Sequence, residues 1–219
     1  MYGLNKKELD LFKKLNTPRK IQDFLERLKV NFENDTCFSP RTVLKKKKAH
    51  CIEAAMFAAA ALRIHGHKPL LLDLTSVDKD EDHVVAVFKQ YGHWGAISKS
   101  NHAVLRYRDP VYKSIRELVM SYFNEYFLNN RKKTLRSYTN PLDLSIFDNY
   151  NWMINEEDMW EIPIYLAEMP HKKILNRAQL AALRKVDPIE VKAGDIEKWS
   201  KRKKRKISKS AEVPRETFI

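Results

Sequence analysis

The sequence is poor in the residues that mark several large classes of protein. It has two cysteines and five glycines among 219 residues, and it has no continuous apolar run of about 18 residues. Two cysteines do not make a disulfide framework, and so few glycines argue against a fibrous chain. The first ten residues include acidic side chains and no apolar stretch, unlike a signal peptide. We therefore expect a cytoplasmic protein with no transmembrane helix and with both thiols reduced.

Metal-binding and phosphate-binding motifs are also missing from the sequence. There is no CxxC pair and no glycine-rich phosphate loop. The spacing of His65, Gly66 and His67 resembles no zinc motif with a defined mechanism, and two cysteines weaken that interpretation further. We therefore expect no metal site and no cofactor. The histidines that raise the question are His65, His67, His83, His93 and His102.

Positive charge is abundant, but much of it is confined to one segment. The net charge is +13, and residues 198–219 hold nine Lys or Arg against two Asp or Glu. This basic tail lacks an apolar period, so we expect it to be disordered and to bind nucleic acid or an acidic partner if it binds at all. The rest of the chain has an ordinary excess of charge, and no membrane partner is expected.

The apolar residues, 43% of the chain, are sufficient for a single domain with a core. Their spacing predicts an α+β fold, in which a small antiparallel sheet packs on a central helix that carries Cys51, with flanking helices. The predicted elements are a helix from Thr17-Pro18, a helix from Cys51 to about Arg63, strands at 69–74, 83–88 and 94–98, a helix from Asp109-Pro110 and a short helix at 177–185.

We divide the chain into four regions on the basis of these elements. Residues 1–36 form an N-terminal helical region, and residues 37–150 form the core. Residues 151–197 form an extension that packs on the core, and residues 198–219 form the basic tail. The last two strands of the core are expected to form an antiparallel hairpin.

Cys51 stands where four lysines and a histidine end and an alanine-rich helix begins, in the stretch KKKKAHCIEAAMFAAAALRIHGHKP. The positive end of a helix dipole favours thiolate, and residues 45–48 would add to that field if they fold nearby. A cysteine nucleophile needs such a setting and a base to take its proton. The alternative is simple packing, because cysteine is among the most buried residue types.

The order of elements around Cys51 resembles the transglutaminase-like, papain-like cysteine superfamily. The segment HCIEAAMFAAAALRIHGHKPLLLDL is similar to its cysteine helix, DHVVAVF to its histidine strand and GHWGAIS to its tryptophan strand. These motifs lie within residues 39–109. The stretch WGAISKSNHAVLRYRDPVYKSIRELVMSYF resembles an uncharacterised bacterial branch, which extends the similarity to about residue 144.

The resemblance implies that Cys51 is the nucleophile and that His83 is the base and then the acid. The third member departs from the family pattern, because Ser98 stands where the family has an aspartate. Continuing the hairpin register places Ser100 or Asn101 opposite His83, with Ser98 nearby. Asn101 gives a papain-like arrangement and is slightly preferred over Ser98. Either side chain would orient the ring by accepting its Nδ1–H, and neither would supply negative charge.

Three further side chains are candidates for binding substrate. Trp94 begins the tryptophan strand, and Arg106 and Arg108 carry planar guanidinium forks that bind carboxylates or phosphates. The alternative for the two arginines is structural: Asp109 would cap a helix and the arginines would pair with acids.

These features favour a cysteine-dependent acyl-transfer protein, which hydrolyses an amide or ester or transfers the acyl group to an amine. Its partner would be a protein, a peptide or another amide-containing substrate. One alternative is a non-catalytic binding domain on the same fold. The other is a nucleic-acid-associated protein that acts through residues 198–219.

Overall fold

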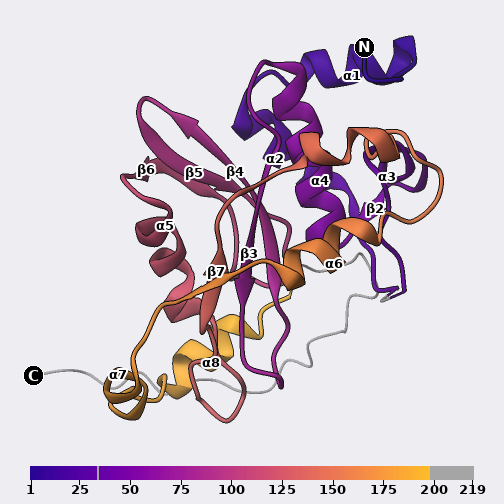
Figure 1. Cartoon of the computed structure of the whole chain (residues 1–219). Coiled ribbons are helices and arrows are strands. Elements are labelled where there is room, and N and C mark those ends of the chain that lie inside the picture. Colours follow the sequence, from indigo (N-terminus) through magenta and orange to yellow (C-terminus); the bar gives the residue numbers. More distant parts are fainter. Residues whose placement is uncertain (34, 198–219) are drawn as a thin grey trace, which may run out of the picture.

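The structure is a computed structural model that describes residues 1–33 and 35–197. It confirms the α+β class: an antiparallel sheet has helices on both of its faces (Figure 1). The prediction of a disordered tail at 198–219 lies outside the described residues. Among the helices of the described part, none is long and apolar enough to cross a membrane.

The main sheet has seven strands in the described residues: β3 (Leu70–Thr75), β4 (His83–Gln90), β5 (His93–Ile97), β6 (Arg108–Tyr112), β7 (Ser137–Thr139), β8 (Leu142–Asp143) and β9 (His171–Lys173). Their order is β6-β5-β4-β3-β7-β9, and β8 also pairs with β3. Successive side chains of a strand point to opposite faces. Ala86 and Ile97 therefore join one core, whereas Val85 and Ala96 join the other.

The predicted hairpin is present as β4 and β5. Lys89 pairs with Trp94 and Gln90 pairs with His93, so the turn contains two residues. These are Tyr91 and Gly92, and both have positive φ angles, 52° and 80°. Two-residue turns of this kind match the twist of the flanking strands. The register places the beginning of β4, where His83 lies, beyond the end of β5 at Ile97.

Four helices cover one face of the sheet: α1 (Lys6–Lys14), α2 (Pro18–Arg27), α3 (Pro40–Lys46) and α4 (Cys51–Ile64). A two-stranded parallel pair, β1 (Lys29–Val30) and β2 (Lys48–Ala49), lies beside them. Thr17 caps α2 and Pro18 occupies its first turn, as predicted. The chain reaches Cys51 directly from β2, so this pair fixes where α4 begins.

Helix α4 is the central helix of the fold, and it is buried along almost its whole length. Six alanines between positions 54 and 61 are at most 2% exposed, and their small side chains let the helix lie close to the sheet. Phe57 fills the space toward the outer helices: its ring stacks on that of Phe24 and is tilted against that of Phe12. Gly66, with a φ of +83°, follows the end of the helix. The predicted helix from Cys51 is confirmed.

The other face of the sheet is covered by α5 (Ile115–Tyr122) and the short 3₁₀ helix η1 (Phe123–Glu125). The prediction that this helix starts at Asp109-Pro110 is wrong. These two residues lie in β6, the edge strand, where a proline removes no ladder hydrogen bond from the interior of the sheet. The helix begins only after Ser114, whose side chain accepts a hydrogen bond from the backbone of Glu117.

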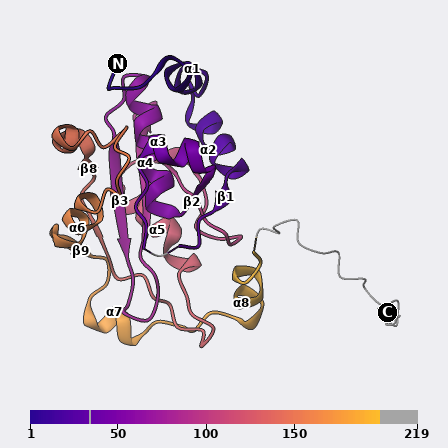
Figure 2. The ribbon, with the colours of Figure 1, turned by 90° about the vertical axis from the view of Figure 1, so that its right-hand side faces the viewer.

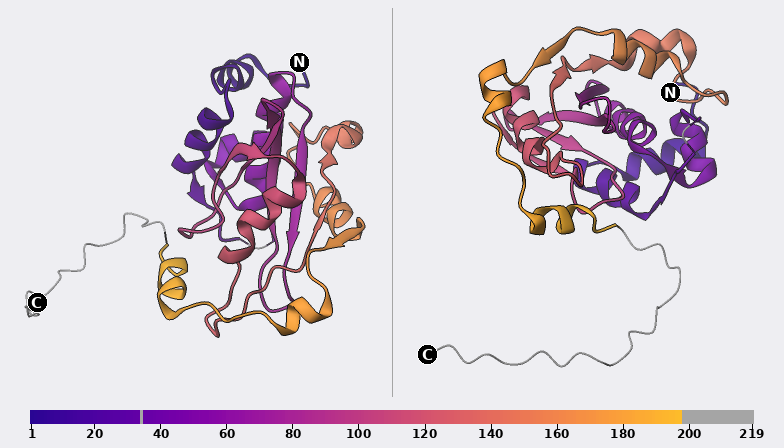
Figure 3. Two further views of the ribbon diagram at one scale, coloured as in Figure 1. Left: turned by 90° about the vertical axis from the view of Figure 1, so that its left-hand side faces the viewer. Right: turned by 90° about the horizontal axis from the view of Figure 1, so that it is seen from below.

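The last described elements are η2 (Leu144–Tyr150), α6 (Glu161–Glu168), α7 (Arg177–Ala181) and α8 (Pro188–Gly194). Trp152 and Ile162 belong to the same core cluster as the side chains of α4, so the extension contributes to that core. Figure 2 shows the ribbon of α6 on the side of β3. The short helix predicted at 177–185 is α7. Helices α7 and α8 lie at the lower end of the sheet (Figure 3), where Ala103 donates its backbone hydrogen to the carbonyl of Ile196, 2.8 Å away.

Candidate active site

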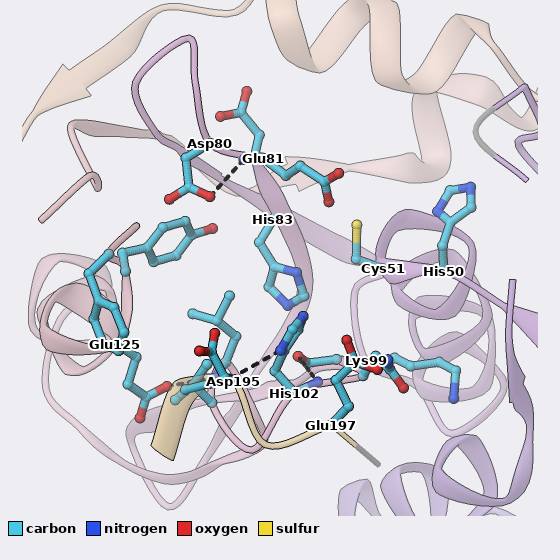
Figure 4. A pocket seen from close by; sticks show the side chains of 18 of the residues that line it. His50, Cys51, Asp80, Glu81, His83, Lys99, His102, Glu125, Asp195 and Glu197 are labelled. Atoms are coloured by element: carbon cyan, nitrogen blue, oxygen red, sulfur yellow. Dashed lines mark hydrogen bonds between the residues drawn. The ribbon is translucent and has the colours of Figure 1, made fainter. Parts of the chain in front are cut away.

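A cleft of about 990 Å³ opens at the end of the sheet where β4 begins and α4 has its N-terminus. Cys51 and His83 line it, together with His50, Asn101 and residues 125–130 (Figure 4). The C-terminal end of α8 forms the opposite wall. The cleft therefore joins parts of the chain that are far apart in sequence, and both catalytic candidates face it.

The charge of the cleft is opposite to that of the whole chain. Two lysines, Lys79 and Lys99, line it. The acidic side chains that line it are Asp80, Glu81, Asp82, Glu125, Asp195 and Glu197. Because nucleic acid is recognised first through its phosphates, an acidic cleft does not suit it. The basic character of the sequence is therefore not a property of this site.

Cys51 is the first residue of α4, and its half-buried thiol faces the cleft between two imidazole rings. His83 lies on one side and His50 on the other (Figure 4). Imidazole rings that carry positive charge or donate a hydrogen bond favour thiolate over thiol.

The His83 ring is buried, and its orientation is fixed by Ser98. Nε2 of His83 lies 2.7 Å from the Ser98 hydroxyl oxygen, and that hydroxyl lies 2.5 Å from the carbonyl oxygen of Leu105. A carbonyl only accepts, so the single hydroxyl proton of Ser98 points to Leu105. The hydroxyl oxygen must then accept from His83. Nε2 therefore carries a hydrogen, and Nδ1 is the nitrogen that can take up a proton.

Ser98 is itself held by two contacts that leave it little freedom. The side-chain amide of Gln22, on α2, accepts from the backbone N–H of Ser98 at 3.0 Å and donates to its carbonyl at 2.7 Å. Leu105 has a φ of 58°, a left-handed conformation that is costly for a bulky side chain. This strain turns the Leu105 carbonyl toward Ser98, and strain of this kind is concentrated at functional sites.

The carboxylate of Glu125 holds Leu105 in place without contacting His83 or Ser98 itself. The backbone N–H of Leu105 donates to Glu125 at 2.7 Å, and the guanidinium of Arg108 lies 2.6 Å from the same carboxylate. Arg108, Glu125, Leu105, Ser98 and His83 thus form one continuous hydrogen-bonded chain that ends at the imidazole. The sequence motif LRYRDPVY contributes to the site by holding this chain.

Two residues of the site were missed by the sequence analysis, His50 and Glu53. His50 is the N-cap of α4, and its Nε2 lies 2.9 Å from the Thr36 carbonyl oxygen and 3.3 Å from a carboxylate oxygen of Glu53. Glu53 is fully buried. Its carboxylate also accepts from the backbone of Phe38 at 3.0 Å and from that of His50 at 2.9 Å. The signal in the sequence was HCIE, a capping box with histidine at the N-cap position.

The surroundings lower the pKa of the Cys51 thiol and raise the pKa of the His50 imidazole. Burial raises the pKa of Cys51, but hydrogen bonds from His50 and His83, the charge of His83 and the Val84 N–H together lower it to about 5. Burial lowers the pKa of His50, but the hydrogen bond with Cys51, the charge of Glu53 and the Thr36 carbonyl raise it to about 9. Near neutral pH, the thiolate and an imidazolium therefore coexist.

The geometry reverses the preference between the two possible partners of His83. The ring contacts Ser98 through Nε2, not Nδ1 as expected, and Asn101 lines the cleft instead. The reason is that the ladder of β5 ends at Ile97. Beyond it the chain leaves the sheet, so the register that placed Ser100 or Asn101 opposite His83 no longer applies.

The three residues expected to bind substrate lie outside the lining of this cleft. Trp94 is at the far end of β5, and the Lys89 ammonium lies 5.7 Å from the centre of its ring. Arg106 pairs with Glu26 and donates to the His102 carbonyl at 2.9 Å. Arg108 pairs with Glu125. Both arginines therefore pair with acidic side chains, as the structural alternative to substrate binding predicted, although neither lies at the start of a helix.

The lysines before Cys51 do not provide the field that the sequence suggested. Lys45 pairs with Glu156 at 2.5 Å, and Lys48 pairs with Glu33 at 2.6 Å. The shift of the Cys51 pKa comes from imidazoles and a backbone N–H.

In the part of the chain that the structure describes, no group of three or more His, Cys, Asp or Glu side chains could hold a metal ion. No protein-family model matches the chain, and no curated protein matches it.

Proposed function

We propose that this protein is a transglutaminase-like cysteine acyl-transfer enzyme, with Cys51 as nucleophile and His83 as general base and acid. One observation carries the proposal: Cys51 and His83 line the same end of a large cleft, and Nε2 of His83 is held by Ser98. Nucleophile, base and orienting group are the three parts by which such sites are recognised.

The acylation step uses these groups in order. The Cys51 thiolate attacks the carbonyl carbon of an amide or ester, and the carbonyl π electrons move to oxygen. Backbone N–H groups in the first turn of a helix have no intrahelical acceptor, so the N-terminus of α4 would stabilise that oxyanion. When the tetrahedral intermediate collapses, His83 gives its Nδ1 proton to the leaving amine or alcohol. Cys51 is then a thioester.

Deacylation reverses the same roles. His83 takes a proton from water or an amine at Nδ1, the resulting nucleophile attacks the thioester carbonyl, and the Cys51 thiolate departs. Ser98 keeps the ring in one orientation through both steps, because its oxygen accepts the Nε2 hydrogen throughout. Among the described residues no carboxylate forms an ion pair with the His83 ring, so the imidazolium is supported by the neutral hydroxyl of Ser98, which itself donates to the Leu105 carbonyl.

A generic acyl donor tests the proposal without knowledge of the substrate. Reaction with p-nitrophenyl acetate should release one equivalent of nitrophenol in a burst and add one acetyl group to Cys51, located by peptide mass spectrometry. Cys37→Ala is the matched control, and it should retain the burst. Cys51→Ala should abolish it, and His83→Ala should slow it by at least about 100-fold at pH 7.

Two outcomes would count against the proposal. Acetyl groups found only on lysines would show that the thiol is not an acyl acceptor. An unchanged burst in His83→Ala would show that no base acts on Cys51, and the cleft would then be better described as a binding site on a transglutaminase-like fold.

A further inference from the structure

We propose that His50 is a second catalytic residue, which stabilises the Cys51 thiolate from the side opposite His83, and that Glu53 is the residue that positions and charges it. This inference rests on the proposed function and adds to it a source for the missing acid. The carboxylate that the family places behind the histidine of the strand is here replaced by a carboxylate on the helix of the nucleophile itself.

The contacts of His50 determine where its hydrogens lie. Nε2 faces two oxygens that only accept, the Thr36 carbonyl at 2.9 Å and a Glu53 carboxylate oxygen at 3.3 Å. Nε2 therefore carries a hydrogen in every state of the ring. Any further proton makes the ring an imidazolium, and two anions lie within reach to stabilise it: the Glu53 carboxylate and the Cys51 thiolate.

The Glu53 carboxylate is enclosed by hydrogen-bond donors. Its side chain has no exposed surface, and it accepts hydrogen bonds from Asn31 at 3.1 Å and 3.2 Å and from Thr36 at 2.9 Å. Backbone N–H groups of Phe38 and His50 complete the set. These donors and the N-terminus of α4 surround the carboxylate and hold it beside the His50 ring, 3.3 Å from Nε2.

The groups that face His50 come from each element packed against it. From α4 they are the Cys51 sulfur and the Glu53 carboxylate, and from the segment before α3 the neutral Thr36 carbonyl. The nearest lysine of β2, Lys48, is paired with Glu33. The charges in contact with the ring are therefore both negative near neutral pH, so a cationic His50 is favoured and its pKa is raised to about 9.

The proposed step is a proton transfer within this cluster. The S–H bond of Cys51 breaks, its electron pair stays on sulfur, and Nδ1 of His83 accepts the proton, which it later gives to the leaving group. A cationic His50 on the opposite side stabilises the thiolate in the meantime.

A purely structural role for His50 is the alternative, because His50 is also the N-cap of α4. His50→Asn separates the two roles, since asparagine is among the best N-cap residues but carries no charge. Glu53→Gln likewise keeps the capping box, in which glutamine also serves at this position, and removes the negative charge. His67→Asn is the matched control beyond the other end of the same helix.

The experiment is the iodoacetamide alkylation rate of Cys51 against pH in the full chain. In the wild-type protein the rate should titrate near the value of about 5 expected for Cys51. His50→Asn should move the midpoint upward by about one to two pH units, which lowers the rate at pH 6 about two- to tenfold. Glu53→Gln should move it in the same direction by less, and His67→Asn should leave it unchanged.

The outcomes separate the inference from the proposed function. An ordinary thiol midpoint in the wild-type protein would contradict the proposed function itself. A low wild-type midpoint that rises in His83→Ala but not in His50→Asn would leave the proposed function standing and overturn this inference.

A second measurement avoids any change at His50. Methylthiolation of Cys51 in the wild-type protein removes the thiolate, so the midpoint of the His50 Cε1–H signal, followed by NMR, should fall from about 9. By reciprocity, the effect of thiolate on imidazole equals that of imidazole on thiolate. An unchanged His50 titration would overturn the inference even if the His50→Asn and Glu53→Gln variants fail to fold.

Discussion

The two cysteines lie near the same buried carboxylate, yet their surroundings act on the two thiols in opposite directions. Burial, and then the charges of Glu53 and Asp158, raise the pKa of Cys37 far above its ordinary value. Cys51 has imidazoles on two sides, and its pKa falls to about 5. Cys37 is fully buried, whereas Cys51 faces the cleft. Cys51 is therefore expected to be reactive, because imidazoles offset the effect of burial on its pKa and the cleft gives reagents access to its sulfur. Cys37 has neither and is expected to be inert.

The largest expected effect is the difference in reactivity between the two thiols. In the folded protein at pH 7, Cys51 should react with iodoacetamide at least about 100-fold faster than Cys37, because only thiolate reacts and only Cys51 is accessible. Timed labelling and peptide mass spectrometry measure both rates in one sample. In denaturant the two rates should agree within about twofold; a preference that survives unfolding would mean that the fold is not its cause.

The pH dependence of acyl transfer should reflect both shifted groups. The thiolate is lost as pH falls through about 5, and the His50 cation is lost as pH rises through about 9. The rate of the nitrophenyl acetate burst should therefore be highest between these limits and fall on both sides. A rate that only begins to rise near pH 8 and keeps rising would indicate an ordinary thiol.

Replacing in turn the two candidates for the third catalytic residue, Ser98 and Asn101, should give a smaller but clear difference in acyl-transfer rate. Ser98→Ala leaves the buried Nε2–H of His83 without its acceptor, at a cost of about 1–3 kcal/mol, so we expect about a tenfold loss of acyl-transfer rate. Asn101→Ala, in the lining of the cleft, should change the rate less than about twofold, because the His83 ring is held by Ser98 and not by Asn101. Burst kinetics of the two variants at pH 7 decide between them, and the opposite ranking would restore Asn101.

The smallest effect is expected at the lysines that precede the nucleophile. Lys46→Gln removes one charge from this run, but exposed charges are screened by solvent and salt. The alkylation midpoint of Cys51 should therefore stay within about 0.3 pH units of the wild-type value. A shift as large as that of His50→Asn would show that the lysine field, and not the imidazole, activates the thiol.

The helix and strands around the site could be predicted because their signals are local. The apolar pattern of the helix that begins at Cys51 and of the strand that begins at His83 is contained in each segment itself, and the structure has these elements at the same places. The role of Ser98 could not be derived, because it depends on where β5 ends and on the left-handed conformation of Leu105. Glu53 was missed because its carboxylate is enclosed by Asn31 and Phe38, which lie 22 and 15 residues before it in the sequence.

In the β6 segment the sequence prediction was wrong because two local signals for a helix start compete. Asp109-Pro110 has the local signature of a helix start, and Ser114 has one as well, five residues later. Pairing of Trp94 with Tyr112 draws the first of these into the sheet. Long-range pairing thus decided between two acceptable local signals, and no local pattern contains that information.

The central claim is that Cys51 is a thiolate at neutral pH because the fold surrounds it with imidazole and backbone donors. The most direct test is the thiolate absorbance at 240 nm of the folded wild-type protein, titrated from pH 4 to pH 10 against a sample alkylated at Cys51. We expect a difference signal that develops around pH 5. A signal that appears only near the ordinary thiol value of about 8.5 would contradict it.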